Sequence, residues 1–134
     1  DLRCFPWPWT DGSVDEIYSR GYYEHAPEFM RTWRESHRVL KPGGTLTLVV
    51  PHFRAPQHPW PEQHHHQFST WTLSHHLHDP DQYCGGRTLF ETVGIRHYFG
   101  PRLRVLAPLA NLSPLAWEWL GLPVAEIEWV GRRV

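Results

Sequence analysis

The sequence predicts an α/β fold, because a strand, a helix and a second strand follow one another within its first 51 residues. Residues 13–19 form a short strand, in which Val14 and Ile17 are apolar but the alternation is imperfect. Residues 45–51 are rich in β-branched side chains and close at Pro51, as a buried strand does. Two strands that are joined through a helix lie parallel in one sheet.

Residues 26–40 predict the helix between these strands. Pro27 suits a first helical turn, where its missing N–H is no loss. Pro42 ends the helix, and Gly43 and Gly44 allow the tight turn that follows. The residues that share the apolar face of this helix are spaced by three or four positions: Phe29, Trp33, His37 and Leu40.

The second half of the chain is less regular. Residues 52–85 hold most of the histidines and lack periodicity, so we predict a long excursion from the sheet edge. Residues 86–93 predict a helix, and residues 95–106 a strand. Residues 125–133 alternate apolar with charged side chains, which indicates a half-exposed antiparallel strand.

Length, charge and cysteine content limit the class of protein. A chain of 134 residues has room for one domain, and 40% hydrophobic residues suffice for a core. A net charge of -1 argues against duplex DNA or an anionic membrane as a partner. No apolar run is long enough to span a membrane. Two distant cysteines do not make a disulfide framework, which favours a reducing, cytoplasmic location.

Three segments carry a resemblance to a known family. They read PWPWTDGSVDEIYSRGYYEHAP, RVLKPGG and TLTLVVP, in this order. The set resembles class I S-adenosylmethionine (SAM) dependent methyltransferases with a type 11-like domain. In that family a Pro- and aromatic-rich loop, an Asp-Gly turn, a strand, a Glu-His pair, a helix and a Leu-Lys-Pro-Gly-Gly turn precede an apolar strand. HHHQFSTWTL and EIEWVGRRV extend the resemblance over nearly the whole chain, less specifically.

The resemblance implies a partial Rossmann-like methyltransferase sheet with flanking helices. Residues 1–134 would be a single partial domain, the C-terminal half, holding the last four strands of a seven-stranded sheet. The N-terminal half, with its Gly-rich loop and ribose-binding acidic residue, is expected to be missing, since the sequence has no GxGxxG-like segment. A start at Asp1 and a single methionine, Met30, also indicate a piece of a longer protein.

The resemblance also implies which residues contact SAM. By position relative to the PWP loop, Asp1 and Leu2 match the pair that contacts the adenine, and a carboxylate can accept from its exocyclic amine. The alternative is that Asp1 is an arbitrary polar residue. Ser19 and Arg20 end the first strand at its carboxyl edge, where ligands bind in open α/β sheets. Gly21 permits close approach of the backbone to the cofactor.

Two histidines are candidate catalytic residues. His25 follows Glu24 in the Glu-His pair of the family, and its imidazole could act as a base near neutral pH. The alternative is that the pair caps and orients the following helix. His52 follows the second strand at the same edge, which suits a substrate-side residue or a solvated loop histidine.

The excursion over residues 52–85 is also rich in potential metal ligands. Imidazole and thiolate bind zinc, but these residues do not form two ligand pairs with a typical spacing such as CxxC or HxxxH. The sequence therefore predicts no metal site. We expect instead a substrate-facing lid, in which histidines line a cleft with Trp60, Phe68 and Trp71; the alternative is a solvated loop. The candidates are His58, His64, His65, His66, His75, His76, His78 and Cys84.

The predicted function is transfer of the SAM methyl group to an unidentified acceptor. The near-neutral charge argues against a nucleic acid as that acceptor. The alternative is a non-catalytic interaction module. Without the first three strands the sheet would have an open edge, which would pair with a second copy of the chain or with the missing half.

Overall fold

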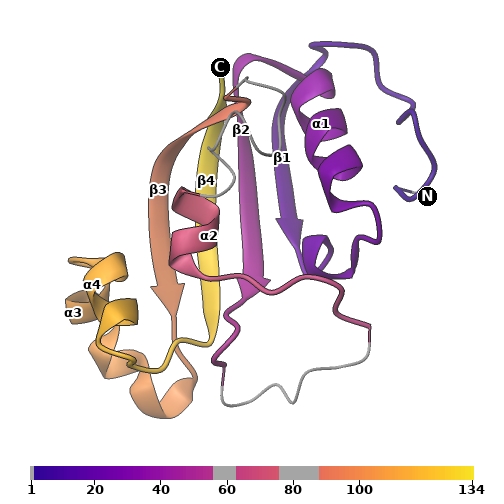
Figure 1. Cartoon of the computed structure of the whole chain (residues 1–134). Coiled ribbons are helices and arrows are strands. Elements are labelled where there is room, and N and C mark those ends of the chain that lie inside the picture. Colours follow the sequence, from indigo (N-terminus) through magenta and orange to yellow (C-terminus); the bar gives the residue numbers. More distant parts are fainter. Residues whose placement is uncertain (1, 56–62, 76–87) are drawn as a thin grey trace.

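The computed structural model describes residues 2–55, 63–75 and 88–134, and within them the strands form one mixed sheet (Figure 1). Along the sheet the strands lie in the order β1, β2, β4, β3. β1 pairs with β2 in parallel, and β4 runs antiparallel to both β2 and β3. The α/β fold that the sequence predicts is therefore confirmed. The strand bounds are β1 Val14–Arg20, β2 Leu40–Pro51, β3 Phe90–Tyr98 and β4 Glu126–Arg133.

β1, β2 and β4 lie where the sequence places them. β2 starts five residues early, at Leu40 rather than at residue 45, because Leu40 already pairs with Val14, before the register shifts and Glu16 pairs with Thr45. β4 alternates as predicted, with Ile127 and Trp129 buried between half-exposed neighbours.

Helix α1 (Phe29–Val39) is shorter than the predicted range of 26–40. Ala26 has an extended backbone, with φ -70° and ψ 111°. The ring of Pro27 disfavours the helical conformation of the residue before it, so the chain cannot run as a helix through this point. The preceding residues form a separate 3-10 turn, η1 (Tyr23–His25).

The prediction of a helix at residues 86–93 is wrong over its described part, because Phe90 starts strand β3. This strand pairs with β4 from Phe90 opposite Arg133 to Tyr98 opposite Glu126. The local sequence does not reveal this partner, and the gain from pairing and burial outweighs a weak helical pattern.

The predicted strand at 95–106 ends at Tyr98 and is wrong beyond it. Pro101 lacks the N–H that a ladder requires and takes the first position of the 3-10 helix η3 (Pro101–Leu106) instead. Two short helices follow, α3 (Ala107–Ala110) and α4 (Pro114–Trp119). Together with α2 (Thr70–Ser74) from the excursion, they precede β4 in the chain.

Part of the core lies between α1 and the sheet. Trp33 of α1 is fully buried, with its ring centroid 4.8 Å from that of Phe90 in β3 and 5.4 Å from that of Trp129 in β4. These contacts fix the helix against strands that are far from it in the sequence. None of the described helices is long and apolar enough to cross a bilayer.

Candidate functional site

The carboxyl ends of β1 and β2 lie side by side at one edge of the sheet, as the arrowheads in Figure 1 show. Arg20, the last residue of β1, pairs with Val49 near the end of β2. Ligands of open α/β sheets bind at such an edge, so the candidate site is built from the residues that follow these two strands.

Ser19, Arg20 and Gly21 occupy this edge, as predicted. The N–H of Gly21 donates to the carbonyl of Val49 at 3.3 Å, and Gly21 has a φ of +72°. That left-handed conformation strongly favours glycine. The guanidinium of Arg20 forms an ion pair of 2.7 Å with Glu126 at the start of β4.

The predicted adenine-binding pair is described in part. Asp1 lies outside the described residues. The Leu2 carbonyl accepts a hydrogen bond of 2.8 Å from the indole of Trp7, whose own backbone N–H donates to Glu35 on α1 at 2.7 Å. Leu2 is thus anchored beside α1, and its predicted contact with the cofactor remains a prediction.

The chain returns from the excursion directly onto this edge. The carbonyl of Glu24 accepts the backbone N–H groups of His65 at 2.7 Å and of His66 at 3.2 Å. Further along, Phe68 forms a parallel bridge with His52, immediately after β2. Residues 63–68 therefore line the site opposite the turn that follows β1.

Neither Glu24 nor His25 occupies the N-cap position of α1. The residue at the N-cap position is Glu28, and no side chain there hydrogen bonds to the helix terminus. Glu24 is buried, at 3% exposure, and His25 is half-buried. The ring Nδ1 of His25 lies 3.0 Å from the carbonyl oxygen of Gln63. Because a carbonyl only accepts, Nδ1 is the donor in this contact, and in the neutral ring Nε2 then keeps its lone pair.

His52 is buried rather than solvated, with its side chain 0% exposed. Its Nδ1 accepts the backbone N–H of Arg54 at 3.0 Å, so the proton of the neutral ring lies on Nε2. Nε2 donates to the Glu118 carboxylate at 3.1 Å. Burial lowers the pKa of His52, although Glu118 opposes this shift, so the imidazole is neutral at pH 7. As a buried group with both nitrogens engaged, His52 can position other groups but does not touch a substrate in this conformation.

His52 belongs to a buried polar cluster that the sequence did not reveal, formed by His52, Thr70, His97 and Glu118. The Glu118 carboxylate also accepts the backbone N–H of Thr70 at 2.6 Å. Burial raises the pKa of Glu118, but the hydrogen bonds from Thr70 and His52 outweigh burial, so the pKa is lowered and the carboxylate is charged. The Thr70 hydroxyl lies 2.7 Å from Nε2 of His97.

A signal for His97 existed in the sequence. Ile95, His97 and Phe99 alternate with the exposed Arg96 and Tyr98, which places the histidine on the inward side of β3. Burial first, and the neighbouring His52 second, lower the pKa of His97 to about 4. Glu118, by contrast, reaches the cluster from α4 through a non-local contact, which no local pattern indicates.

Acid is expected to destabilise the fold through His97. Its pKa is about 4 in the folded chain and 6.5 for an exposed histidine. Between these values the unfolded chain binds a proton that the folded chain does not. The free energy of unfolding therefore falls as the pH drops from about 6.5 to 4, by up to about 3 kcal/mol.

Urea unfolding at a series of pH values measures this dependence. Above about pH 6.5 His97 contributes no slope, because both states are neutral there. In a His97→Asn variant the slope in the acid window should decrease. A variant with the same slope as the parent chain would show that His97 is not the group responsible.

An open pocket of about 280 Å³ adjoins the buried polar cluster through Glu118. It places a cation, an anion and aromatic rings together, a combination suited to a small organic molecule. Of the predicted lid residues, Trp71 lines this pocket, whereas Phe68 is buried in the core at 4% exposure. The lining residues are Arg54, Trp71, Leu115, Glu118 and Trp119. Several lid candidates lie outside the described residues: His58, Trp60, His76, His78 and Cys84.

Comparison with known proteins supports the family resemblance. Residues 3–48 match the family model of a methyltransferase domain, a segment that covers β1, α1 and most of β2. No curated protein matches the chain.

Solved structures share the fold at low sequence identity. A SAM-dependent methyltransferase from Mesorhizobium loti is 18% identical, with a TM-score of 0.57 over 99% of this chain and 67% of that chain. The methyltransferase solved with the activator Trm112 from Haloferax volcanii is 18% identical, with a TM-score of 0.60 over 99% of this chain and 58% of that chain. The cyclase SpnF is 18% identical, with a TM-score of 0.57 over 99% of this chain and 53% of that chain.

The chain therefore has the fold of a class I SAM-dependent methyltransferase domain, and residues 3–48 carry the sequence pattern of that family. It spans between about half and two thirds of the length of these three solved chains. The likeness to a cyclase shows that this fold supports more than one reaction, so the fold alone does not specify the activity of this chain.

Proposed function

We propose that this chain is part of a SAM-dependent methyltransferase that transfers a methyl group to an O, N or C atom of an acceptor. The proposal rests on one observation: the segment that matches the family model also forms the part of the sheet where a ligand is expected to bind. The segment that matches the methyltransferase family model folds into the strand–helix–strand unit whose carboxyl edge holds Ser19, Arg20 and Gly21. A ligand site belongs at that edge.

The chain would supply part of the cofactor site. The backbone at Ser19, Arg20 and Gly21 would face the methionine portion of SAM, and Asp1 with Leu2 would contact the adenine. The left-handed turn at Gly21 fits this role, because it brings backbone close to a ligand with no Cβ in the way. The remaining cofactor contacts would come from outside this chain, since its sequence has no Gly-rich loop before a helix.

SAM would supply a methyl group on a sulfonium, which is already an activated electrophile. The protein's own task would be to align the acceptor and exclude water. His52 would serve as a positioning residue, because its ring is buried and linked to Glu118 and Arg54. His25 has its Nε2 lone pair available at the edge, where it would act on the acceptor side as a base or as a ligand.

The pocket beside Glu118 would hold the acceptor. Trp71 and Trp119 offer aromatic surface, and Glu118 and Arg54 offer opposite charges for orientation. Aromatic side chains with a few polar groups are typical of sites for small organic molecules.

Replacing Gly21 with Ala is expected to weaken SAM binding by about tenfold, or about 1.4 kcal/mol. A residue with a Cβ is strained in the left-handed conformation, so the backbone would shift away from it and disturb the carboxyl end of β1, where the cofactor is proposed to bind. Calorimetric titration of SAM into the 134-residue chain measures the affinity.

Gly43→Ala is the matched control. Gly43 has a φ of +78° and open space around it, so it suffers the same backbone strain, but it lies near the amino end of β2. Its variant should lose a similar amount of stability and keep its affinity for SAM. If Gly21→Ala binds SAM as tightly as the parent chain, or if Gly43→Ala loses as much affinity, the proposed cofactor contact at Gly21 is contradicted.

One feature favours a second candidate function, an interaction module. Among the described residues, β1 pairs with β2 alone, so its other edge presents backbone N–H and C=O groups. Tyr18 on this strand is 60% exposed. A second copy of the chain or a missing half would pair there, and the Haloferax volcanii relative was likewise solved with a partner protein. Light scattering on the titrated sample distinguishes the methyltransferase from the interaction module. A dimer that does not bind SAM favours the interaction module, and a monomer that binds SAM argues against it.

A further inference from the structure

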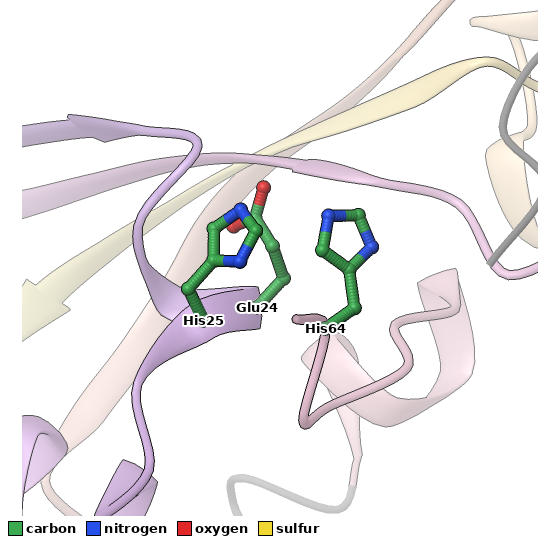
Figure 2. Close-up of side chains that lie close together, drawn as sticks. All are labelled: Glu24, His25 and His64. Carbon is green, nitrogen blue, oxygen red and sulfur yellow. The ribbon is translucent and has the colours of Figure 1, made fainter. Parts of the chain in front are cut away.

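We propose that Glu24, His25 and His64 form a binding site for a divalent transition-metal ion. Each residue offers one ligand atom, and the three atoms all lie within 4.8 Å of one another. Figure 2 shows the two imidazoles next to each other, with the Glu24 side chain beside that of His25. The proposal concerns metal binding and does not depend on methyl transfer.

Two elements that are distant in the sequence create this arrangement. The 3-10 turn η1 contributes Glu24 and His25, and the return of the excursion contributes His64. The carbonyl of Glu24 accepts the N–H groups of His65 and His66, so the backbone on the C-terminal side of His64 is fixed. As a result the rings of His25 and His64 meet edge to face, with centroids 4.5 Å apart.

His25 has the outer hydrogen bond that metal-bound histidines typically have. Its Nδ1–H donates to the Gln63 carbonyl at 3.0 Å, which fixes the tautomer and the ring orientation. A histidine ligand usually donates its other ring N–H to a carbonyl or carboxylate in this way. The bond comes from the residue next to His64, so one backbone segment both orients the first imidazole and supplies the second.

The third ligand is a buried carboxylate. Glu24 is only 3% exposed, and a charged carboxylate loses hydration when it is buried. A dication next to the carboxylate offsets this loss. The pair of histidines and the burial of Glu24 thus favour the same occupant.

The ligand set selects the kind of ion. Two imidazoles and one carboxylate suit zinc or ferrous iron, whereas magnesium and calcium prefer oxygen ligands alone. Ligand atoms around a tetrahedral zinc ion are about 3.3 Å apart, so the three side chains would close in by small torsional changes. Three protein ligands leave a fourth position for water or for an atom of a bound molecule.

Zinc titration in competition with a chromogenic chelator tests the proposal on the untagged, metal-free 134-residue chain. We expect one zinc ion per chain with micromolar or tighter affinity. His64→Gln should weaken binding by more than about 100-fold, beyond the 10- to 100-fold effect typical of an outer-shell residue. Cobalt in place of zinc should give the visible absorption of a tetrahedral ion, and this signal should be lost in the same variant.

His65→Gln is the matched control, because His65 is adjacent and exposed and its ring is outside the trio. It should bind zinc as the parent chain does. Residue 64 lies outside every helix and strand, so far-ultraviolet circular dichroism should show a retained fold in both variants. The proposal is overturned if the parent chain does not bind zinc, if His64→Gln binds as tightly as the parent, or if both variants lose zinc equally.

Discussion

Replacing Trp33 with Ala is expected to lower the free energy of unfolding by about 3–5 kcal/mol. The indole is fully buried and stacks on Phe29 of its own helix, with ring centroids 5.9 Å apart. It also contacts Phe90 and Trp129 from two different strands. Removal of the ring leaves a cavity at the junction of α1 with the antiparallel part of the sheet, which the rigid strands cannot fill.

Urea unfolding followed by circular dichroism measures this loss. Trp119→Ala is the control, because Trp119 is 84% exposed and its removal should change stability by no more than about 0.5 kcal/mol. Equal losses in the two variants would mean that α1 does not pack on the sheet as described.

Gly131→Ala is expected to cost about 3 kcal/mol, an unusually large effect for one added methyl group. A Cβ at this position would lie within 2.7 Å of three ring carbons of Trp129. The ring cannot move away easily, because it is fully buried and its indole N–H donates to the Thr92 hydroxyl at 2.9 Å. The methyl group would therefore displace the centre of the core.

Gly94→Ala on the neighbouring strand is the matched control. A Cβ there would meet no atom within 4 Å, and its φ is not in the left-handed region, so the substitution should be neutral or slightly stabilising. Thermal unfolding of the two variants under the same conditions compares them. If Gly131→Ala unfolds at the temperature of the parent chain, the indole of Trp129 does not lie over residue 131.

The sequence alone predicts the elements whose structure depends on a local pattern of residues. β1, α1 and β2 follow from periodicity, proline and glycine, and β4 follows from strict alternation. β3 was predicted in part as helix because its structure depends on pairing with β4, some thirty residues later in the chain. Ala26 shows the opposite case: the rule for residues before proline is local and would have excluded Ala26 from α1.

The site divides in the same way. The positions of Ser19, Arg20 and Gly21 follow from the end of a strand, which the sequence reveals. The meeting of His64 with Glu24 depends on where a long excursion returns, and periodicity holds no information on that. The buried partnership of His52 with Glu118 is equally non-local, which is why His52 was expected at the surface of the site rather than beneath it.

The order of strands has a consequence for the protein during its synthesis. β4 lies between β2 and β3, although it is made after both of them. A nascent chain that has reached only residue 125 can pair β1 with β2, but β3 then has no neighbour in the sheet, and the inner side of Phe90 lacks the cover of Trp129. The segment Glu126–Arg133 must therefore leave the ribosomal exit tunnel before the sheet can close. Until then the apolar surfaces of β2 and β3 are accessible to chaperones and proteases.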